Sequence, residues 1–117
     1  MTLICGRVNF FSGPHLVFKY WLRGKFMRII IVGCGKVGSS IASELNLEGH
    51  EISVVDINHG AVDKLANSLD VLGIEGNGAT YDVLIEAGAE YADLLIAATA
   101  RDEINLYSCL MAKAAGV

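Results

Sequence analysis

Apolar runs and helical periodicities alternate along this chain beyond its first quarter. The run at residues 29–32, Ile-Ile-Ile-Val, is β-branched without interruption, which is typical of a strand buried on both faces of a parallel sheet. After a glycine-rich turn, Val37, Ile41 and Leu45 recur at i, i+4 and i+8. That spacing predicts a helix, ending near Gly49, which buries this stripe against the strand.

The same pairing of strand and helix recurs along the rest of the chain. Strands are predicted over residues 51–56, 71–74 and 94–98, each a short apolar stretch bounded by turn residues. Helices are predicted over residues 81–87 and 102–115, and around the stripe formed by Val62, Leu65, Ala66 and Leu69. This order of elements predicts a parallel sheet with right-handed crossovers and helices on both faces.

The predicted fold class is therefore α/β, a Rossmann-like doubly wound parallel sheet truncated after about four strands. A complete dinucleotide-binding fold has about six strands. The sequence ends at Val117, where a fifth strand of this pattern should begin. We expect either that the domain is incomplete at its C-terminal end or that a partner chain supplies the missing edge.

The first 26 residues differ in composition from the rest of the 117-residue chain. They contain six of the nine aromatic residues and the only proline, and residues 1–28 hold five basic residues and no acidic one. A clean apolar segment with a small-residue cleavage site is absent, so an export signal is not predicted. Three interpretations of this leader, residues 1–26, stay open: sequence upstream of a true start at Met27, a segment lying on a membrane surface, or an extra element packed on the domain. The domain itself is assigned to residues 27–117.

Charge and cysteine content narrow the class of protein. From residue 29 on, four basic residues face thirteen acidic ones, a net charge of −9, so this part should repel nucleic acid. The three cysteines form no Cys-x-x-Cys pair and are odd in number, which argues against a disulfide framework or a zinc site. The three histidines lack the spacing of metal ligands. A reducing cytoplasmic location is expected.

A glycine pattern follows the first predicted strand directly. Residues 33–38 read Gly-Cys-Gly-Lys-Val-Gly, a G-x-G-x-x-G motif placed between a strand and a helix as dinucleotide-binding sites require. In that context Gly33 allows the tight turn, Gly35 lets the backbone approach a pyrophosphate, and Gly38 lets the helix pack on the strand. The unpaired N–H groups of the helix N-terminus also favour phosphate. The alternative for the glycines is that they serve only the tight turn between strand and helix. Lys36 lies either near the phosphates or in solvent.

An acidic residue closes the second predicted strand. Asp56 follows Gly38 by eighteen residues, the spacing at which a carboxylate accepts hydrogen bonds from the ribose hydroxyls of adenosine. A carboxylate there repels a 2′-phosphate, and residues 57–59 provide no arginine, so NAD(H) is predicted over NADP(H). ATP or ADP fits the same contacts, and an N-cap role for Asp56 is the alternative. The residues predicted to bind the cofactor in these two segments are Gly33, Cys34, Gly35, Lys36, Val37, Gly38, Asp56 and Ile57; a redox role for Cys34 is also open.

Four signatures together are specific to one family. They are MRIIIVGCGKVG at residues 27–38, VVD at 54–56, GNGAT at 76–80 followed by Leu84 and Ala87-Gly88, and ADLLIAAT at 92–99 followed by Asp102, Glu103 and Asn105. Ordinary dehydrogenases share only the first two, so the last two are the specific ones. With these signatures, residues 27–117 resemble the N-terminal domain of the RCK/KTN (TrkA-type) family of potassium-transport regulators.

The resemblance implies a cytosolic regulatory module that binds NAD(H), or ATP or ADP, and does not catalyse a reaction. The implied partner is the membrane subunit of a potassium transporter or channel, whose assembly and gating ligand binding would control. Homo-oligomers, as dimers or rings, and a location in the cytoplasm or at the inner face of the cell membrane are implied as well.

The resemblance also assigns roles to residues. It implies that the three motif glycines hold the pyrophosphate and that Asp56 holds the ribose. It places the turn from Asn77 to Thr80 on the adenine side of the ligand, and Ala98 and Thr99 beside its phosphate or nicotinamide half. Asn77 stands where the family commonly has aspartate, which removes a charge. Arg101 either reaches a terminal phosphate or is solvated.

Two other classes of function stay open from the sequence. An NAD-dependent oxidoreductase needs a general acid or base near the nicotinamide. The strand ends offer only Cys34, Asn77, Thr99 and Asp102 for that role, and no histidine. A structural fragment that binds nothing is the third class. Binding of NADH or ATP separates the fragment from the other two, and turnover of NADH separates an enzyme from a regulator.

Overall fold

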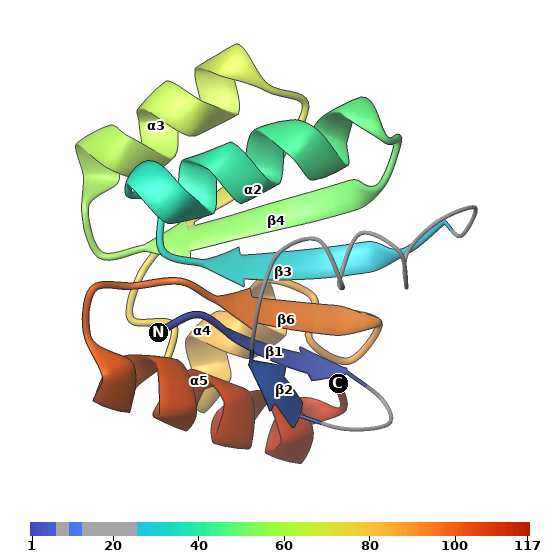
Figure 1. Cartoon of the computed structure of the whole chain (residues 1–117), viewed down its shortest axis with the longest axis vertical. Helices are drawn as coiled ribbons and strands as arrows, with labels where there is room; N and C mark the ends of the chain where they lie inside the picture. Colours follow the sequence, from blue (N-terminus) through green and yellow to red (C-terminus); the bar gives the residue numbers. More distant parts are fainter. Residues whose placement is uncertain (7–9, 13–25) are drawn as a thin grey trace.

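The computed structural model describes residues 1–6, 10–12 and 26–117 of the chain. These residues form a mixed sheet of six strands in the order β2-β1-β6-β3-β4-β5, with helices on both faces (Figure 1). The strands are β1 (Leu3–Gly6), β2 (Phe10–Ser12), β3 (Arg28–Val32), β4 (Glu51–Asp56), β5 (Leu72–Glu75) and β6 (Leu94–Ala97). The helices are α2 (Lys36–Leu47), α3 (His59–Ser68), α4 (Tyr81–Glu86) and α5 (Asp102–Ala115).

Four of the strands form the parallel part of the sheet. β3 lies between β4 and β6, and β5 continues beyond β4. The registers pair Val32 with Val55 on one side and with Ala97 on the other, so the carboxyl ends of these strands meet at one edge. The strand order reverses between β3 and β6, and doubly wound sheets bind ligands at such a point. The predicted α/β class, with four parallel strands, is confirmed.

The central strand β3 is buried on both faces, as its uninterrupted apolar run predicts. Ile29 and Ile31 belong to the core packed under α2 and α3, whereas Ile30 and Val32 belong to the core under α4 and α5. The two pairs of helices therefore cover opposite faces of the sheet, and Figure 1 shows α2 and α3 in the upper half of the view and α4 and α5 in the lower half. Each such buried side chain contributes roughly 1.5–3 kcal/mol relative to an exposed one.

The buried stripe of α2 begins one residue later than predicted. Gly38, Ile41, Ala42 and Leu45 face the core, whereas Val37 is 50% exposed. The prediction of Val37 as a core residue is therefore wrong. The reason is the tight turn that precedes the helix, because the helix must approach β3 through its smallest residue, Gly38.

Strand β1 is an element that the sequence pattern did not predict. It pairs antiparallel with β6, and β2 pairs antiparallel with β1. The edge beside β6, which was expected to be missing or supplied by a partner chain, is therefore occupied by residues 3–6 of the same chain. The pairing of residues 3–6 with β6 is compatible with the interpretation of the leader as an extra element on the domain, which stays a prediction for the leader as a whole. Residues 7–9 and 13–25 of the leader lie outside the described residues, and the division of the chain at Met27 stays a prediction.

No helix in the described part of the chain is long and apolar enough to cross a membrane.

Candidate functional site

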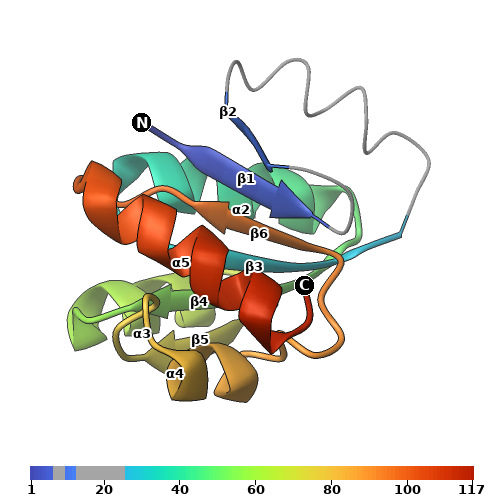
Figure 2. The ribbon, with the colours of Figure 1, turned by 90° about the horizontal axis from the view of Figure 1, so that it is seen from below.

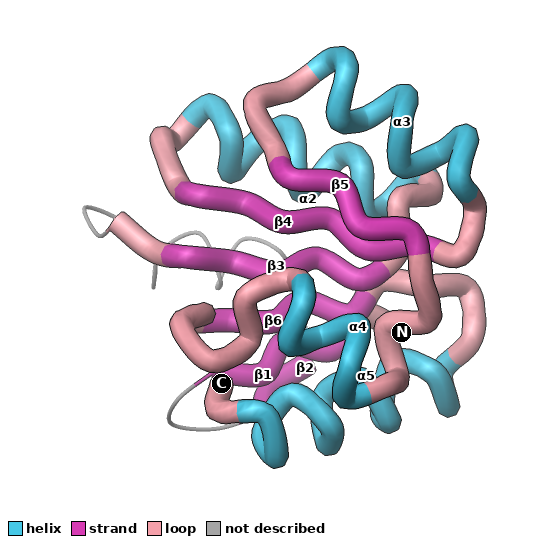
Figure 3. The backbone as a smooth tube through the Cα atoms, turned by 180° about the vertical axis from the view of Figure 1, so that it is seen from behind, coloured by secondary structure: helices cyan, strands magenta, loops and turns pink. Residues whose placement is uncertain are grey.

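A cavity of about 420 Å³ lies at the carboxyl ends of the parallel strands. The loops that follow β3, β4, β5 and β6 are gathered along this edge of the sheet (Figure 3). Its lining residues are Val32, Gly33, Gly35, Val55, Asp56, Ile57, Gly76, Asn77, Gly78, Ala98, Thr99, Ala100, Arg101 and Ile104. Seven of the residues predicted as a nucleotide site are thus brought together around one cavity: Gly33, Gly35, Asp56, Ile57, Asn77, Ala98 and Thr99.

The three motif glycines have different physical reasons to be glycine. Gly33 has φ +108°, in the left-handed region, and a Cβ there would lie 2.9 Å from the backbone of Ala98. A Cβ on Gly38 would lie 1.7 Å from the carbonyl oxygen of Gly33, so this glycine allows the contact between helix and turn. Around the Cβ position of Gly35, no heavy atom of the described residues beyond its own chain neighbours lies within 4 Å. The packing of the turn therefore explains Gly33 and Gly38 but gives no reason for a glycine at position 35, which faces the cavity.

The N-terminus of α2 has two features that favour the binding of an anion. Gly35 is its N-cap and supplies no side-chain hydrogen bond, and its first turn carries no acidic residue. The other three helices in the described part of the chain differ, because α3 is capped by Asn58 and the first turns of α4 and α5 contain acidic residues. The first N–H groups of a helix have no intrahelical acceptor and carry a partial positive charge. Among the four helices of the described residues, α2 alone has neither a side-chain cap nor an acidic residue in its first turn.

Asp56 holds two loops together at the cavity. One carboxylate oxygen, Oδ2, accepts a hydrogen bond of 2.7 Å from the backbone N–H of Cys34, and the other, Oδ1, accepts one of 2.9 Å from the N–H of Asn58. The expected alternative, an N-cap role, belongs to Asn58, whose Oδ1 accepts from the N–H of Ala61 at 3.1 Å. The side chain of Asp56 is therefore directed at the glycine-rich turn and held there by both of its oxygens.

The turn after β5 closes the cavity on a second side. Asn77 Oδ1 accepts from the N–H of Ala79 at 2.9 Å, and its carbonyl oxygen accepts from the N–H and hydroxyl of Thr80. A Cβ on Gly78 would lie 2.4 Å from the Val32 side chain, so this glycine lets the turn pack against the end of β3. Asn77 thus lines the cavity, but both its side-chain oxygen and its backbone carbonyl oxygen accept hydrogen bonds within its own turn.

The segment after β6 forms the third side. The N–H of Ala98 donates to the carbonyl of Val32 at 2.8 Å, which holds the segment beside the glycine-rich turn. The N–H of Thr99 donates to Asn105 Oδ1 at 2.9 Å, and the Thr99 hydroxyl donates to the same oxygen at 2.6 Å. Arg101 also lines the cavity, and its guanidinium pairs with Glu103 at 2.7 Å.

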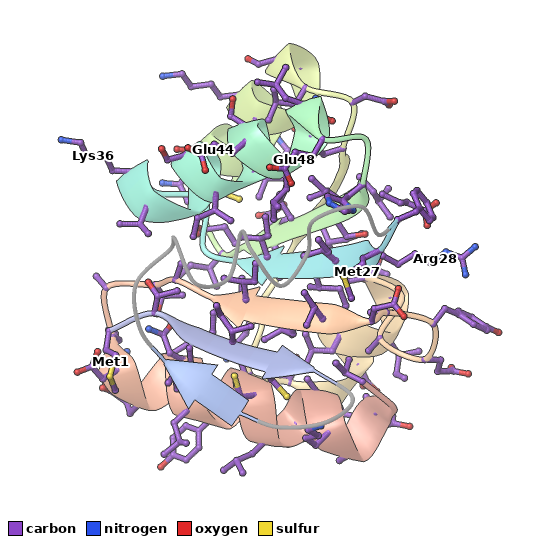
Figure 4. All side chains as sticks on the ribbon, turned by 45° about the vertical axis from the view of Figure 1, so that its right-hand side comes forward. Met1, Met27, Arg28, Lys36, Glu44 and Glu48 are labelled. Atoms are coloured by element: carbon purple, nitrogen blue, oxygen red, sulfur yellow. The ribbon has the colours of Figure 1, made fainter. Side chains whose placement is uncertain are left out.

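Four predicted site residues do not line the cavity. Cys34 is buried in the core under α2, and its contribution to the site is the backbone N–H bound to Asp56. Burial, with the nearby charge of Asp56 adding to it, raises the pKa of the Cys34 thiol to about 12, which is unfavourable for a redox thiolate. The side chain of Lys36 points outward from the start of α2 (Figure 4). Val37 is exposed and Gly38 is buried beneath the turn.

Sequence reasoning assigned no site role to several residues that shape the site. Gly76 and Ile104 line the cavity, as does Gly78 in the turn expected on the adenine side, and Asn105, noted only as part of a signature, holds the segment after β6 from behind. A signal for Asn105 was present, because it falls on the same face of α5 as the buried residues Cys109 and Ala112. A polar side chain on a buried helical face requires hydrogen-bond partners.

A larger cleft of about 830 Å³ opens at the opposite, amino-terminal edge of the strands. It is lined by residues such as Arg28, Glu51 and Tyr91. Neither the glycine-rich turn nor the N-terminus of α2 contributes to it. Because the larger cleft lacks these phosphate-binding features, the smaller cavity is the candidate site.

A family model described as the TrkA-N domain matches residues 29–116, which is most of the chain. This chain belongs to the TrkA-N domain family. Similar curated proteins are the Trk system potassium uptake protein TrkA of Azorhizobium caulinodans, 42% identical over 83 residues, and that of Vibrio alginolyticus, 41% identical over 86 residues. The Trk system potassium uptake protein TrkA homolog of Pyrococcus abyssi is 34% identical over 87 residues.

The TrkA-N domain described here corresponds to a part of these relatives. The matches cover 71%, 74% and 74% of this chain, but only 18%, 19% and 38% of the respective relatives. Among solved structures, the enzyme WbmG of Bordetella bronchiseptica in complex with NAD is similar with a TM-score of 0.45 and 30% identity, covering 59% of this chain and 23% of that one. That TM-score is too low to bear on ligand or function.

Proposed function

We propose that this TrkA-N domain binds an adenine nucleotide in the cavity at the carboxyl ends of β3, β4, β5 and β6. NAD(H) is the preferred ligand, and ATP or ADP is the alternative. The observation that carries the proposal is the free space at Gly35, a glycine that its own protein packing does not require. A glycine at this place lets a pyrophosphate approach the backbone closely.

The phosphates are held by the first turn of α2. Its N–H groups have no side-chain cap among the described residues, and no acidic residue in that turn opposes an anion. Gly35 leaves the approach to these groups open. A phosphate at this position accepts hydrogen bonds from the backbone and is stabilised by the helix dipole.

The adenosine ribose is held by Asp56. Its carboxylate is fixed by two backbone N–H groups, which leaves acceptor positions on both oxygens for the ribose hydroxyls. Glu75 pairs with Asp56 in the strand register and directly precedes the lining residue Gly76, so a second acidic residue lies near this end of the cavity. Its carboxylate contacts His59 at 3.2 Å. Two neighbouring carboxylates disfavour a 2′-phosphate and therefore favour NAD(H) over NADP(H).

The remaining two sides of the cavity receive the ends of the ligand. In this proposal the turn at Asn77 contacts the adenine side, and Ala98 and Thr99 contact the nicotinamide half or a second phosphate. Arg101 lines the same wall but is already paired with Glu103, so its guanidinium does not present a free charge to the ligand.

The domain acts as a regulator in this proposal. The cavity-lining residues within the described part of the chain include no histidine, cysteine, lysine or tyrosine, and Cys34 is held neutral in the core. The site therefore offers a place to bind a nucleotide but few groups for proton transfer. This supports nucleotide sensing over the alternative, an NAD-dependent oxidoreductase.

The relatives supply the context of that regulation. They are named as potassium uptake proteins of the Trk system, which supports a role in controlling a potassium transporter or channel through its membrane subunit. Nucleotide binding in the cavity would then bias the assembly and gating of that system from the cytoplasmic side, with homo-oligomers as the assembling unit.

Thermal and chemical unfolding with added nucleotides test the proposal. A ligand at one hundred times its dissociation constant stabilises the folded state by about 2.7 kcal/mol. NAD, NADH, ATP and ADP are compared at matched concentrations, with NADP and inorganic phosphate as controls. Stabilisation by at least one adenine nucleotide, stronger than by NADP, is the expected result. No stabilisation by any of the four nucleotides at millimolar concentration would contradict the proposal, and consumption of NADH with a small carbonyl compound would favour the enzyme.

A further inference from the structure

Strand β1 brings the beginning of the chain next to the wall of the cavity. It pairs antiparallel with β6 from Leu3 opposite Ala97 to Gly6 opposite Leu94. Because the pairing begins at the carboxyl end of β6, the residues before Leu3 lie beside the segment that follows β6. The two strands and the N-terminal end of α5 are side by side in both views of the ribbon (Figures 1 and 2).

Asn105 connects β1 to that segment. Its side chain is fully buried, and its Oδ1 accepts from the N–H and the hydroxyl of Thr99 at 2.9 and 2.6 Å. Its Nδ2 donates to the carbonyl of Met1 at 2.7 Å and to the carbonyl of Thr99 at 3.2 Å. An amide side chain has two donors and two acceptor positions. All four are used, three by Thr99 in the cavity wall and one by the residue at the start of the chain.

The bond to Met1 adds a fourth contact to an amide whose orientation already fits its three bonds to Thr99. With the Met1 carbonyl in place, one Nδ2 proton is satisfied and Oδ1 is directed at Thr99. When β1 leaves the edge, the Nδ2 proton that is bound to the Met1 carbonyl loses this protein acceptor, and the covered amide is opened to water. The amide is then held by Thr99 alone, and we expect Thr99 to be less firmly positioned in the cavity wall.

The residues of β1 itself are held on the domain by core packing and by a hydrogen bond from α5. Ile4 is packed in the core on the α2 side of the sheet, and Cys5 is packed in the core on the α5 side. At the other end of the strand, Lys113 donates a hydrogen bond to the carbonyl oxygen of Gly6. Helix α5 therefore holds both ends of β1, through Asn105 at one end and Lys113 at the other.

We infer that Asn105 is a positioning residue through which the docking of β1 on β6 sets the arrangement of Thr99 in the nucleotide cavity. This inference rests on the proposed function for its consequence: docking of β1 and binding of nucleotide stabilise each other. A strand that replaced β1 at this edge would release Met1 from Asn105 and weaken nucleotide binding. By thermodynamic reciprocity, bound nucleotide holds β1 on the edge.

The experiment compares two variants of the full chain that are destabilised at different places. Ile4→Ala loosens β1, and Leu65→Ala removes a comparable buried side chain on α3, which packs on β4 and β5. Leu65 does not line the cavity. Amide hydrogen exchange at Thr99 and the dissociation constant of NADH are measured for both. We expect Ile4→Ala to speed exchange at Thr99 selectively and to weaken NADH binding by about three- to tenfold, the effect of losing one hydrogen bond. Leu65→Ala should bind NADH with the wild-type affinity.

A third variant tests whether the weakening of NADH binding by Ile4→Ala acts through the side-chain amide of Asn105. In Asn105→Ala, NADH binding should already be weakened, and adding Ile4→Ala should weaken it no further. Equal exchange at Thr99 in the Ile4→Ala and Leu65→Ala variants overturns the inference, whether or not Asn105→Ala folds. If the wild-type chain binds no nucleotide, the proposed function fails, but selective exchange at Thr99 still supports the positioning by Asn105.

Discussion

The carboxylate of Asp56 accepts a hydrogen bond of 2.7 Å from the backbone N–H of Cys34. This bond joins the end of β4 to the glycine-rich turn after β3, the two places where a dinucleotide fold grips the adenosine and the pyrophosphate. The second carboxylate oxygen binds the N–H of Asn58. The acid is therefore oriented before any ligand arrives, and little free energy is needed to place it for binding.

Replacing Asp56 with Asn tests this arrangement. The amide keeps one acceptor but presents an N–H group to one of the two backbone donors, so we expect a loss of about 1–3 kcal/mol in the free energy of unfolding. The affinity for NADH should fall about tenfold or more, because the ribose loses an ionised acceptor. Urea unfolding and calorimetric titration measure the two effects. Asp70→Asn makes the same chemical change on an exposed residue away from the cavity and should alter neither quantity.

The acidic end of the cavity predicts discrimination against a 2′-phosphate. Asp56 and Glu75 are neighbours in the strand register. We expect NADPH to bind about tenfold or more weakly than NADH, because like charges brought together at a binding site are costly. The difference should shrink as salt is added, since screening weakens the repulsion. Equal affinities for the two cofactors at low salt would show that the ribose does not lie beside these carboxylates.

Gly38 allows helix α2 to pack closely on the glycine-rich turn. A Cβ at this position would overlap the carbonyl oxygen of Gly33 at 1.7 Å, and backbone atoms give way only at high cost. We expect Gly38→Ala to lower the free energy of unfolding by about 3 kcal/mol or more. Chemical unfolding followed by circular dichroism measures it. A stable Gly38→Ala variant would mean that the turn between β3 and α2 is looser than described.

Cys34 predicts a dependence of stability on alkaline pH. Burial first, and then the charge of Asp56, raise the pKa of the folded thiol from 9.0 to about 12. A raised folded-state pKa stabilises the protein below the unfolded value, and this contribution is lost as the pH rises from about 9 to about 12. The loss is up to about 1.4 kcal/mol per pH unit. In Cys34→Ala the decline between pH 9 and 11 should be shallower, while NADH binding persists because the contact to Asp56 uses the backbone. Parallel curves for the two proteins would refute this role of the thiol.

The parallel sheet could be predicted because its signals are local. The β-branched run of β3 and the helical stripes repeat at spacings that each element sets for itself. Val37 shows the limit of such signals, since its helical spacing is right but its exposure is decided by how the turn packs. Strand β1 could not be predicted, because its place depends on pairing with β6, about ninety residues away along the chain.

The candidate site likewise contains residues that could be predicted from the sequence and residues that could not. Gly33, Gly35 and Asp56 stand at fixed offsets from the strands, so their meeting at the strand ends could be expected from the sequence. Which of the motif residues face the cavity depends on side-chain direction, and Cys34 turns into the core while Gly35 faces outward. The role of Asn105 required the position of Met1, which only the folded chain brings beside it.

The binding of NADH to Gly35→Ala tests the central claim most directly. Beyond its own chain neighbours, no heavy atom of the described residues lies within 4 Å of the added methyl group, so stability should stay within about 1 kcal/mol of the wild type. The same methyl group would stand where the pyrophosphate approaches the backbone, so the affinity for NADH should fall about tenfold or more. Gly60→Ala, on α3 and away from the cavity, is the matched control and should bind NADH normally. A folded Gly35→Ala variant with wild-type affinity for NADH would contradict the account.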